Sequence, residues 1–138
     1  MDNENLLNSI YQNIAMVLET IRKITTDCDF KALIISQEEE YQNLSDSIKD
    51  TITSNGDSTE ELNDLLKTYS EWMTKLKAMS DKNVSHLSEM CIQGYTMGMI
   101  KAIQKNHLYC DASKEAKHFG DKLISLHEKS IQDLKKYL

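Results

Sequence analysis

Apolar residues recur at spacings of three and four along almost the whole chain, which is the repeat that places them on one face of a helix. The first such run predicts a helix over residues 5–25. Its apolar face consists of Leu7, Ile10, Ile14, Val17, Ile21 and Ile24. A short turn at residues 26–29 makes the next helix, over residues 30–53, an antiparallel neighbour. The stripe of that second helix is Phe30, Leu33, Gln37, Tyr41, Leu44, Ile48 and Ile52.

A break at residues 54–57 separates this pair from the rest of the chain. Gly56 suits the left-handed position that follows a helix, and residues 58–61 form a capping box that starts a third helix. The apolar face of that helix consists of Leu62, Leu65, Leu66, Tyr69, Trp72, Met73, Leu76 and Met79. We expect a break or sharp kink at residues 80–83, because an unbroken helix would be about twice as long as its neighbours. Asp81 or Asn83 then caps the following helix.

The run from Val84 to His107 is apolar around most of its circumference and predicts a helix buried among the others. Its polar seam consists of His86, Glu89, Gln93 and Thr96. The apolar side opposite consists of Val84, Leu87, Cys91, Gly94, Tyr95, Gly98 and Ala102. Glycine inside a helix costs about 1 kcal/mol relative to alanine. We therefore expect the backbone of a neighbouring helix to approach closely at Gly94 and Gly98.

A last helix is predicted from residues 111–113 to the end of the chain. It buries Ala116, Phe119, Gly120, Leu123, His127, Ile131, Leu134 and Leu138. The sequence contains no strand pattern, internal repeat or linker. These patterns predict a single all-α domain over residues 1–138, an antiparallel bundle of four long core helices. It has five helical segments, because the third region is broken near Asp81.

The composition argues against several classes of function. The net charge is -6, and Arg22 is the only arginine among 16 basic residues, so binding to nucleic acid is not expected. With no proline and four glycines, the chain has no phosphate-cradling loop, which argues against nucleotide-dependent enzymes. Three cysteines and an acidic, polar N-terminus suit a cytoplasmic protein without a membrane segment.

Some helical bundles of this size hold two iron or manganese ions, and that site has a recognisable pattern. It needs a Glu-x-x-His step on each of two helices and a glutamate on each of the others. The only such step here is Glu115 to His118, and His118 lies nearly opposite the apolar stripe of its helix. A standard dinuclear iron or manganese site is therefore not expected.

His127 is the main candidate for a less usual site, because it lies in the middle of an apolar stripe. A neutral imidazole there needs a hydrogen-bond partner, and the simplest interpretation is a core histidine bonded to Gln37, a tyrosine or a backbone carbonyl. The alternative is a mononuclear iron, manganese or zinc site formed by His127, Glu40 and Glu89, with His86 as a further ligand. The simpler interpretation of His86 and Glu89 is a solvated pair near a helix start.

The sulfur-containing residues allow similar alternatives. Met73, Met79, Met90, Met97 and Met99 cluster on two predicted helices, where they fill an irregular core or bind helical partners or copper(I). Cys91 is expected to be a core residue. Cys28 and Cys110 act as thiol sensors only if their thiol pKa is lowered.

The segment SHLSEMCIQGYTMG at residues 85–98, with QEEEY at 37–41 and LKKYL at 134–138, resembles a group of small uncharacterised helical proteins from clostridia and related anaerobes. These proteins look similar in length and organisation to ferritin-like bundles. The resemblance implies a ferritin-like four-helix topology and no known activity. Because the Glu-x-x-His pairs are missing, iron chemistry does not follow from the resemblance.

These observations lead to a non-enzymatic cytoplasmic protein without a cofactor, whose role is interaction with an unidentified protein partner or self-association, for example as a homodimer. No exposed apolar stripe in the sequence demands a dimer. Two alternatives remain. One is a ferritin-like metal-binding protein of redox or storage type, and the other is a thiol-based stress sensor.

Overall fold

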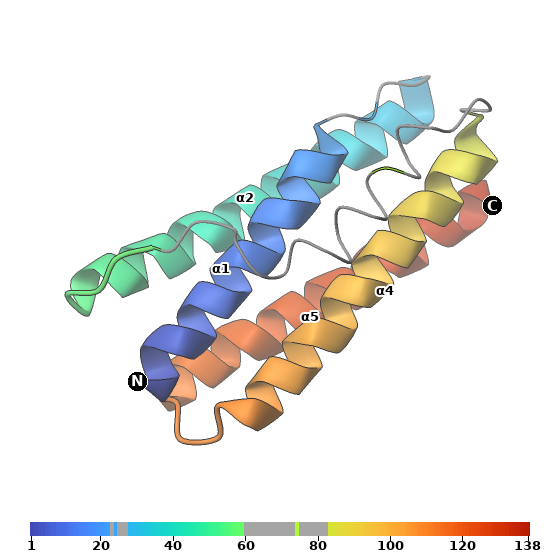
Figure 1. Ribbon diagram of the computed structural model, residues 1–138. Coiled ribbons are helices and arrows are strands. Elements are labelled where there is room, and N and C mark those ends of the chain that lie inside the picture. Colours follow the sequence, from blue (N-terminus) through green and yellow to red (C-terminus); the bar gives the residue numbers. More distant parts are fainter. Residues whose placement is uncertain (23, 25–27, 60–73, 75–82) are drawn as a thin grey trace.

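The computed structural model of the chain describes residues 1–22, 24, 28–59, 74 and 83–138 (Figure 1). Its helices are α1 (Asp2–Ile21), α2 (Cys28–Ser54), α4 (Val84–Leu108), α5 (Lys114–Leu134) and the short 3-10 helix η1 (Lys135–Tyr137). Every regular element in these residues is a helix, which confirms the all-α prediction. The third helix predicted from residue 58, its capping box and the break at 80–82 fall largely outside the described residues.

The four long helices lie alongside one another (Figure 1). α1 and α2 run in opposite directions, as do α4 and α5, whereas α2 and α4 run in the same direction. The N-terminus lies beside the connection between α4 and α5, and the C-terminus lies at the other end, beside the start of α4. None of the described helices is both long enough and apolar enough to cross a membrane.

Helix α1 contributes most to the core among the described helices. It packs against α2, α4 and α5, and eleven of its residues are buried, compared with six in α4. The reason is that α1 carries two adjacent apolar stripes, one through Leu6 and Ile10 and the other through Leu7 and Ile14. The prediction that α4 is buried on most sides is wrong, because Ile100 is 48% exposed on its outer face.

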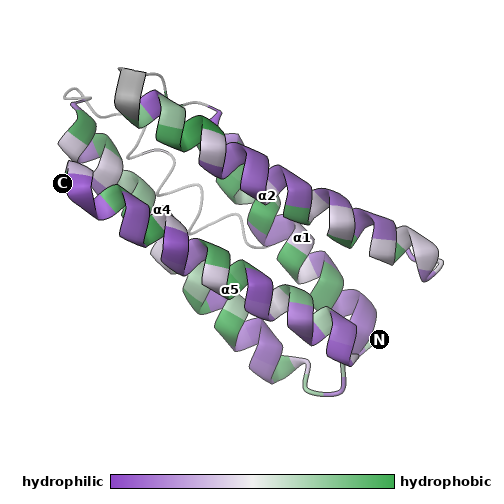
Figure 2. Cartoon of the chain, turned by 180° about the vertical axis from the view of Figure 1, so that it is seen from behind, coloured by the Kyte–Doolittle hydropathy of each residue, from purple (hydrophilic) through white to green (hydrophobic). Residues whose placement is uncertain are grey.

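The stripes of α2 and α5 differ from the predicted ones in detail. In α2, Ile34 and Ser45 are buried, whereas Leu33 and Leu44 are only half-buried. In α5, hydrophobic residues (green in Figure 2) recur between hydrophilic ones (purple). Ser130 is buried there, but Leu138, predicted to be buried, is 62% exposed because the α-helix ends at Leu134 and η1 follows.

Local signals in the sequence explain where the helices begin and end. The Oδ1 atom of Asn83 accepts the His86 N–H at 2.9 Å, which confirms Asn83 as the cap of α4. Ser113 caps α5 in the same way, with its Oγ 3.1 Å from the Ala116 nitrogen. Gly56 has φ 80°, and the N–H groups of Gly56 and Asp57 donate to carbonyls of the last turn of α2. This is the left-handed glycine cap predicted for α2.

Candidate functional site

A closed polar network lies in the middle of the core, where α1, α2, α4 and α5 face one another. Its side chains are Asn13 from α1, Gln37 and Tyr41 from α2, Tyr95 from α4, and His127 and Ser130 from α5. Each is at most 3% exposed. Buried polar groups are costly unless they are hydrogen-bonded, so the pairing within the network decides whether it stabilises the fold.

Both ring nitrogens of His127 have a partner. Nδ1 lies 2.8 Å from the Tyr41 hydroxyl oxygen, and Nε2 lies 3.0 Å from Oδ1 of Asn13. The Asn13 Nδ2 atom donates to the Gly98 carbonyl at 2.9 Å, so the amide oxygen is the atom that faces the imidazole. Nε2 therefore carries the hydrogen, and Nδ1 accepts the Tyr41 O–H.

The second half of the network connects α2 with α4 and α5. The Tyr95 hydroxyl donates to Oε1 of Gln37 at 2.5 Å, and Nε2 of Gln37 donates to the Ser130 carbonyl at 3.3 Å. The hydroxyl oxygens of Tyr41 and Ser130 are 3.2 Å apart. Because the Tyr41 hydrogen points to His127, the Ser130 hydroxyl is the donor in this pair. The four helices are thus joined by bonds between buried side chains.

Gly98 makes room for the centre of this network. A Cβ atom added at Gly98 would lie 2.9 Å from Nε2 of His127 and 3.0 Å from Oδ1 of Asn13. The neighbour that requires glycine is therefore a pair of side chains, and not the helix backbone that the sequence suggested. The aromatic rings pack closely around the same point: those of Tyr41 and Tyr95 are stacked with centroids 5.7 Å apart, and the Tyr41 and His127 centroids are 5.4 Å apart.

Burial keeps the network uncharged. It lowers the pKa of His127 from 6.5 to about 3, so the imidazole is neutral at neutral pH. It raises the pKa of Tyr41 and of Tyr95 well above 10, and it raises the pKa of the Cys91 thiol to about 12. No hydroxyl or thiol in this part of the core is therefore ionised at neutral pH, and Cys91 is a core residue as predicted.

The four candidate metal ligands are not brought together by the structure. His127 lies in the core, whereas Glu40 lies at the surface, where its Oε1 atom is 2.7 Å from Nζ of Lys129. His86 and Glu89 are exposed near the start of α4. A metal ion at His127 would need the Nδ1 lone pair, which accepts the Tyr41 hydrogen bond.

The simplest interpretation of His127 is confirmed, with Tyr41 as the tyrosine partner. The sequence reasoning missed Asn13 and Ser130. Both had a positional signal: Asn13 lies three residues after Ile10 and four before Val17, and Ser130 lies three residues after His127. These spacings place each polar residue on a core face, where it needs a buried partner.

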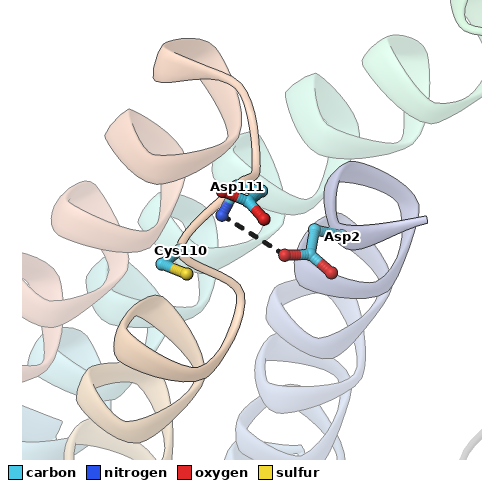
Figure 3. Close-up of side chains that lie close together, drawn as sticks. All are labelled: Asp2, Cys110 and Asp111. Carbon is cyan, nitrogen blue, oxygen red and sulfur yellow. Dashed lines mark hydrogen bonds between the residues drawn. The ribbon is translucent and has the colours of Figure 1, made fainter.

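An exposed cluster joins the N-terminus to the loop between α4 and α5 (Figure 3). Within the described ranges, Asp2, Cys110 and Asp111 are the only three potential ligands whose donor atoms lie within 4.8 Å of one another. Oδ2 of Asp2 accepts the Asp111 N–H at 3.2 Å, and Oδ1 of Asn3 accepts the Ser113 hydroxyl at 2.6 Å. These contacts hold the loop, and with it Cys110 and Asp111, against the start of α1.

A shallow groove of about 390 Å³ lies between α1 and α2. Arg22 is one of its lining residues, and its guanidinium bonds to Glu38 at 3.0 Å and to Gln42 at 2.7 Å. The only arginine of the protein is thus engaged within the chain. The groove is lined by Tyr11, Ala15, Leu18, Glu19, Arg22, Gln42 and Ser45.

Comparison of the chain with protein-family models, with curated proteins and with solved structures found no match.

Proposed function

We propose that the protein is a non-enzymatic, cytoplasmic helical-bundle protein that associates with a second copy of itself through the outer face of α4. The observation that carries this proposal is the exposure of two isoleucines three residues apart, Ile100 at 48% and Ile103 at 36%. They continue a strip of half-buried side chains at Ile92, Thr96 and Met99. The spacing of Ile92, Thr96, Met99 and Ile103 is the alternation of four and three that is typical of paired helices.

A second copy suits this strip because the polar residues at its two ends are complementary. If two α4 helices pair in antiparallel fashion about a two-fold axis near residue 98, Glu89 lies opposite the partner's His107, and Thr96 lies opposite the partner's Ile100. Each such contact occurs twice in a two-fold dimer. The arrangement places a carboxylate near an imidazole at each end of the apolar strip, whereas a parallel arrangement would place like side chains together.

The expected dimer is weak. Fully burying an isoleucine side chain contributes roughly 1.5–3 kcal/mol, so two half-exposed isoleucines from each copy contribute about 4 kcal/mol in total. Association itself costs several kcal/mol of lost freedom. We therefore expect a transient dimer that forms only at high protein concentration.

Sedimentation velocity over a range of protein concentrations tests this proposal. The wild-type protein should show a sedimentation coefficient that rises with concentration, and Ile103→Lys should remove that rise. Ile35→Lys is the matched control, because Ile35 is 53% exposed on α2, a different helix. A wild-type protein that stays monomeric at all concentrations contradicts the proposal, as does a dimer that Ile103→Lys leaves intact.

The ferritin-like topology belongs to the same proposal. The direction of the helices supports this topology. α2 and α4 run in the same direction and are connected through residues 55–83, as in bundles with one long crossover. Metal binding in such a bundle stays a prediction that elemental analysis for iron, manganese and zinc tests, on protein purified without a chelator or an affinity tag. A thiol-sensor role stays a prediction for the exposed Cys110 and for Cys28, whose side chain lies outside the described part of the structure.

A further inference from the structure

The hydrogen bond between Tyr41 and His127 joins a phenol to a neutral base in a site closed to water. The Tyr41 oxygen and Nδ1 of His127 are 2.8 Å apart, and both residues are 0% exposed. The Nδ1 lone pair faces the hydroxyl, since Asn13 holds the hydrogen on Nε2. This distance lies within the range over which a side-chain base takes a proton directly.

Such a pair matters for one-electron chemistry. A phenol that loses an electron becomes a strong acid, and a buried site cannot release the proton to water. Without a base in reach, oxidation would leave an unpaired positive charge in the core, at a large cost in free energy. A base already hydrogen-bonded to the phenol lowers that cost, because the positive charge moves to the imidazole, which holds a proton more tightly than an oxidised phenol does.

We propose that Tyr41 is a redox-active tyrosine that gives one electron to a one-electron oxidant of the peroxyl or aryl-radical class, while its proton passes to Nδ1 of His127. The O–H bond of Tyr41 breaks and an N–H bond forms on His127. The products are a neutral tyrosyl radical, an imidazolium ion and the reduced oxidant. When a reductant returns the electron to Tyr41, the proton moves back and the starting state is restored.

The hydrogen-bond partners of the pair are kept in both states. After the transfer, Nε2 of His127 still donates to Asn13, and Nδ1 becomes a donor to the Tyr41 oxygen. The Ser130 hydroxyl, 3.2 Å away, continues to donate to that oxygen. Burial raises the pKa of Tyr41, so the proton does not leave before the electron. Burial also lowers the pKa of His127, so the ring is neutral before the transfer, and it takes the proton only because the oxidised phenol is a much stronger acid.

Tyr95 provides a control within the same protein. It stacks on Tyr41 with the rings 9° from parallel, and it is 3% exposed. Its hydroxyl, however, donates to the amide oxygen of Gln37, which is a very weak base. The two tyrosines therefore share an environment but differ in the proton acceptor, and only Tyr41 should form a stabilised radical.

The test is photochemical oxidation of the full-length protein with a ruthenium tris-bipyridine complex and persulfate, followed by freezing and electron paramagnetic resonance. We expect a tyrosyl radical with an exchangeable proton coupling, and with a nitrogen coupling that changes when the histidines are labelled with nitrogen-15. Tyr95→Phe should keep this signal and Tyr41→Phe should lose it, with both folds checked by circular dichroism. A coupled signal that persists in Tyr41→Phe overturns the proposal.

A measurement on the wild-type protein alone covers the case in which Tyr41→Phe does not fold. That variant leaves Nδ1 of His127 without a donor, which costs roughly 1–3 kcal/mol. In the wild type, the yield of the coupled radical should be constant between about pH 6 and pH 8.5, because the proton stays within the pair. The absence of a histidine-coupled radical overturns the proposal, and so does a yield of that radical that rises with pH as for tyrosine in water.

Discussion

Gly98 is the residue on which the geometry of the buried network depends most closely. Alanine is a better helix former than glycine by about 1 kcal/mol, so Gly98→Ala would stabilise an isolated α4. In the folded protein the new Cβ would lie 2.9 Å from Nε2 of His127 and would push the imidazole away from Asn13. We expect Gly98→Ala to lower the free energy of unfolding by roughly 1–3 kcal/mol, as measured by urea denaturation.

The control for this substitution is Gln93→Ala, at an exposed position of the same helix. It changes helix propensity without touching the network, so its effect should stay within about 0.5 kcal/mol. If Gly98→Ala is as stable as the wild type, then His127 and Asn13 do not occupy the positions described above.

At the level of single residues, the sequence indicates which side chains face the core but not which of them meet. His127 and Gln37 were predicted to be buried from the spacing of their apolar neighbours. The cost of an unpaired imidazole predicted a hydrogen-bond partner for His127, with Gln37, a tyrosine and a backbone carbonyl left open. Asn13 was not predicted as the second partner. It is separated from His127 by 114 positions in the chain, and only the packing of α1 against α5 brings the two together.

Among the helices, α4 is capped at its start by the Asn83 side chain. Asn83 accepts the His86 N–H at 2.9 Å, and the first turn of α4 contains no acidic residue that would complement the helix dipole. We expect Asn83→Ala to lower the free energy of unfolding by about 1 kcal/mol, as measured by urea denaturation.

Asn83→Ser is the matched variant, because a serine hydroxyl can accept the same hydrogen bond. It should retain most of the wild-type stability. Equal stabilities of the alanine and serine variants would show that the cap contributes little to the fold.

The ends of the helices were easier to predict than which face of each helix is buried. Gly56 and Asn83 act within their own turns, so local sequence placed Gly56 and narrowed the cap of α4 to Asp81 or Asn83. The outer face of α4 was mispredicted because its apolar residues continue around the helix, which leaves periodicity unable to distinguish a core face from an exposed one. Its exposed isoleucines became evident only from the packing of α1 and α5 against the other side.

For the molecule as a whole, the network makes stability sensitive to acid through His127. Its pKa is about 3 in the folded protein and 6.5 in an unfolded chain, so below pH 6.5 the unfolded state binds a proton that the folded state does not. The stability that the protein gains from its neutral, buried His127 is therefore complete above about pH 6.5 and is lost as the pH falls toward 3. In the middle of this range the free energy of unfolding should fall by up to about 1.4 kcal/mol per pH unit.

Urea denaturation of the wild type and of His127→Gln at several pH values isolates this effect. The variant should be less stable at pH 7.5, because it loses the bonds of the imidazole to Tyr41 and Asn13. Its stability should fall less steeply than that of the wild type between about pH 6.5 and pH 4.5. Parallel profiles would mean that other groups cause the loss of stability in acid.

The protonation state of His127 is the feature on which the network, its stability and the redox proposal all depend. Nuclear magnetic resonance of nitrogen-15-labelled histidine side chains measures it directly, with the exposed His86, His107 and His118 as internal references. We predict that His127 keeps a neutral ring with the hydrogen on Nε2 from about pH 8 down to about pH 4.5, given its pKa of about 3. A ring with the hydrogen on Nδ1, or one that takes up a proton near its ordinary pKa of 6.5, would contradict the closed network described here.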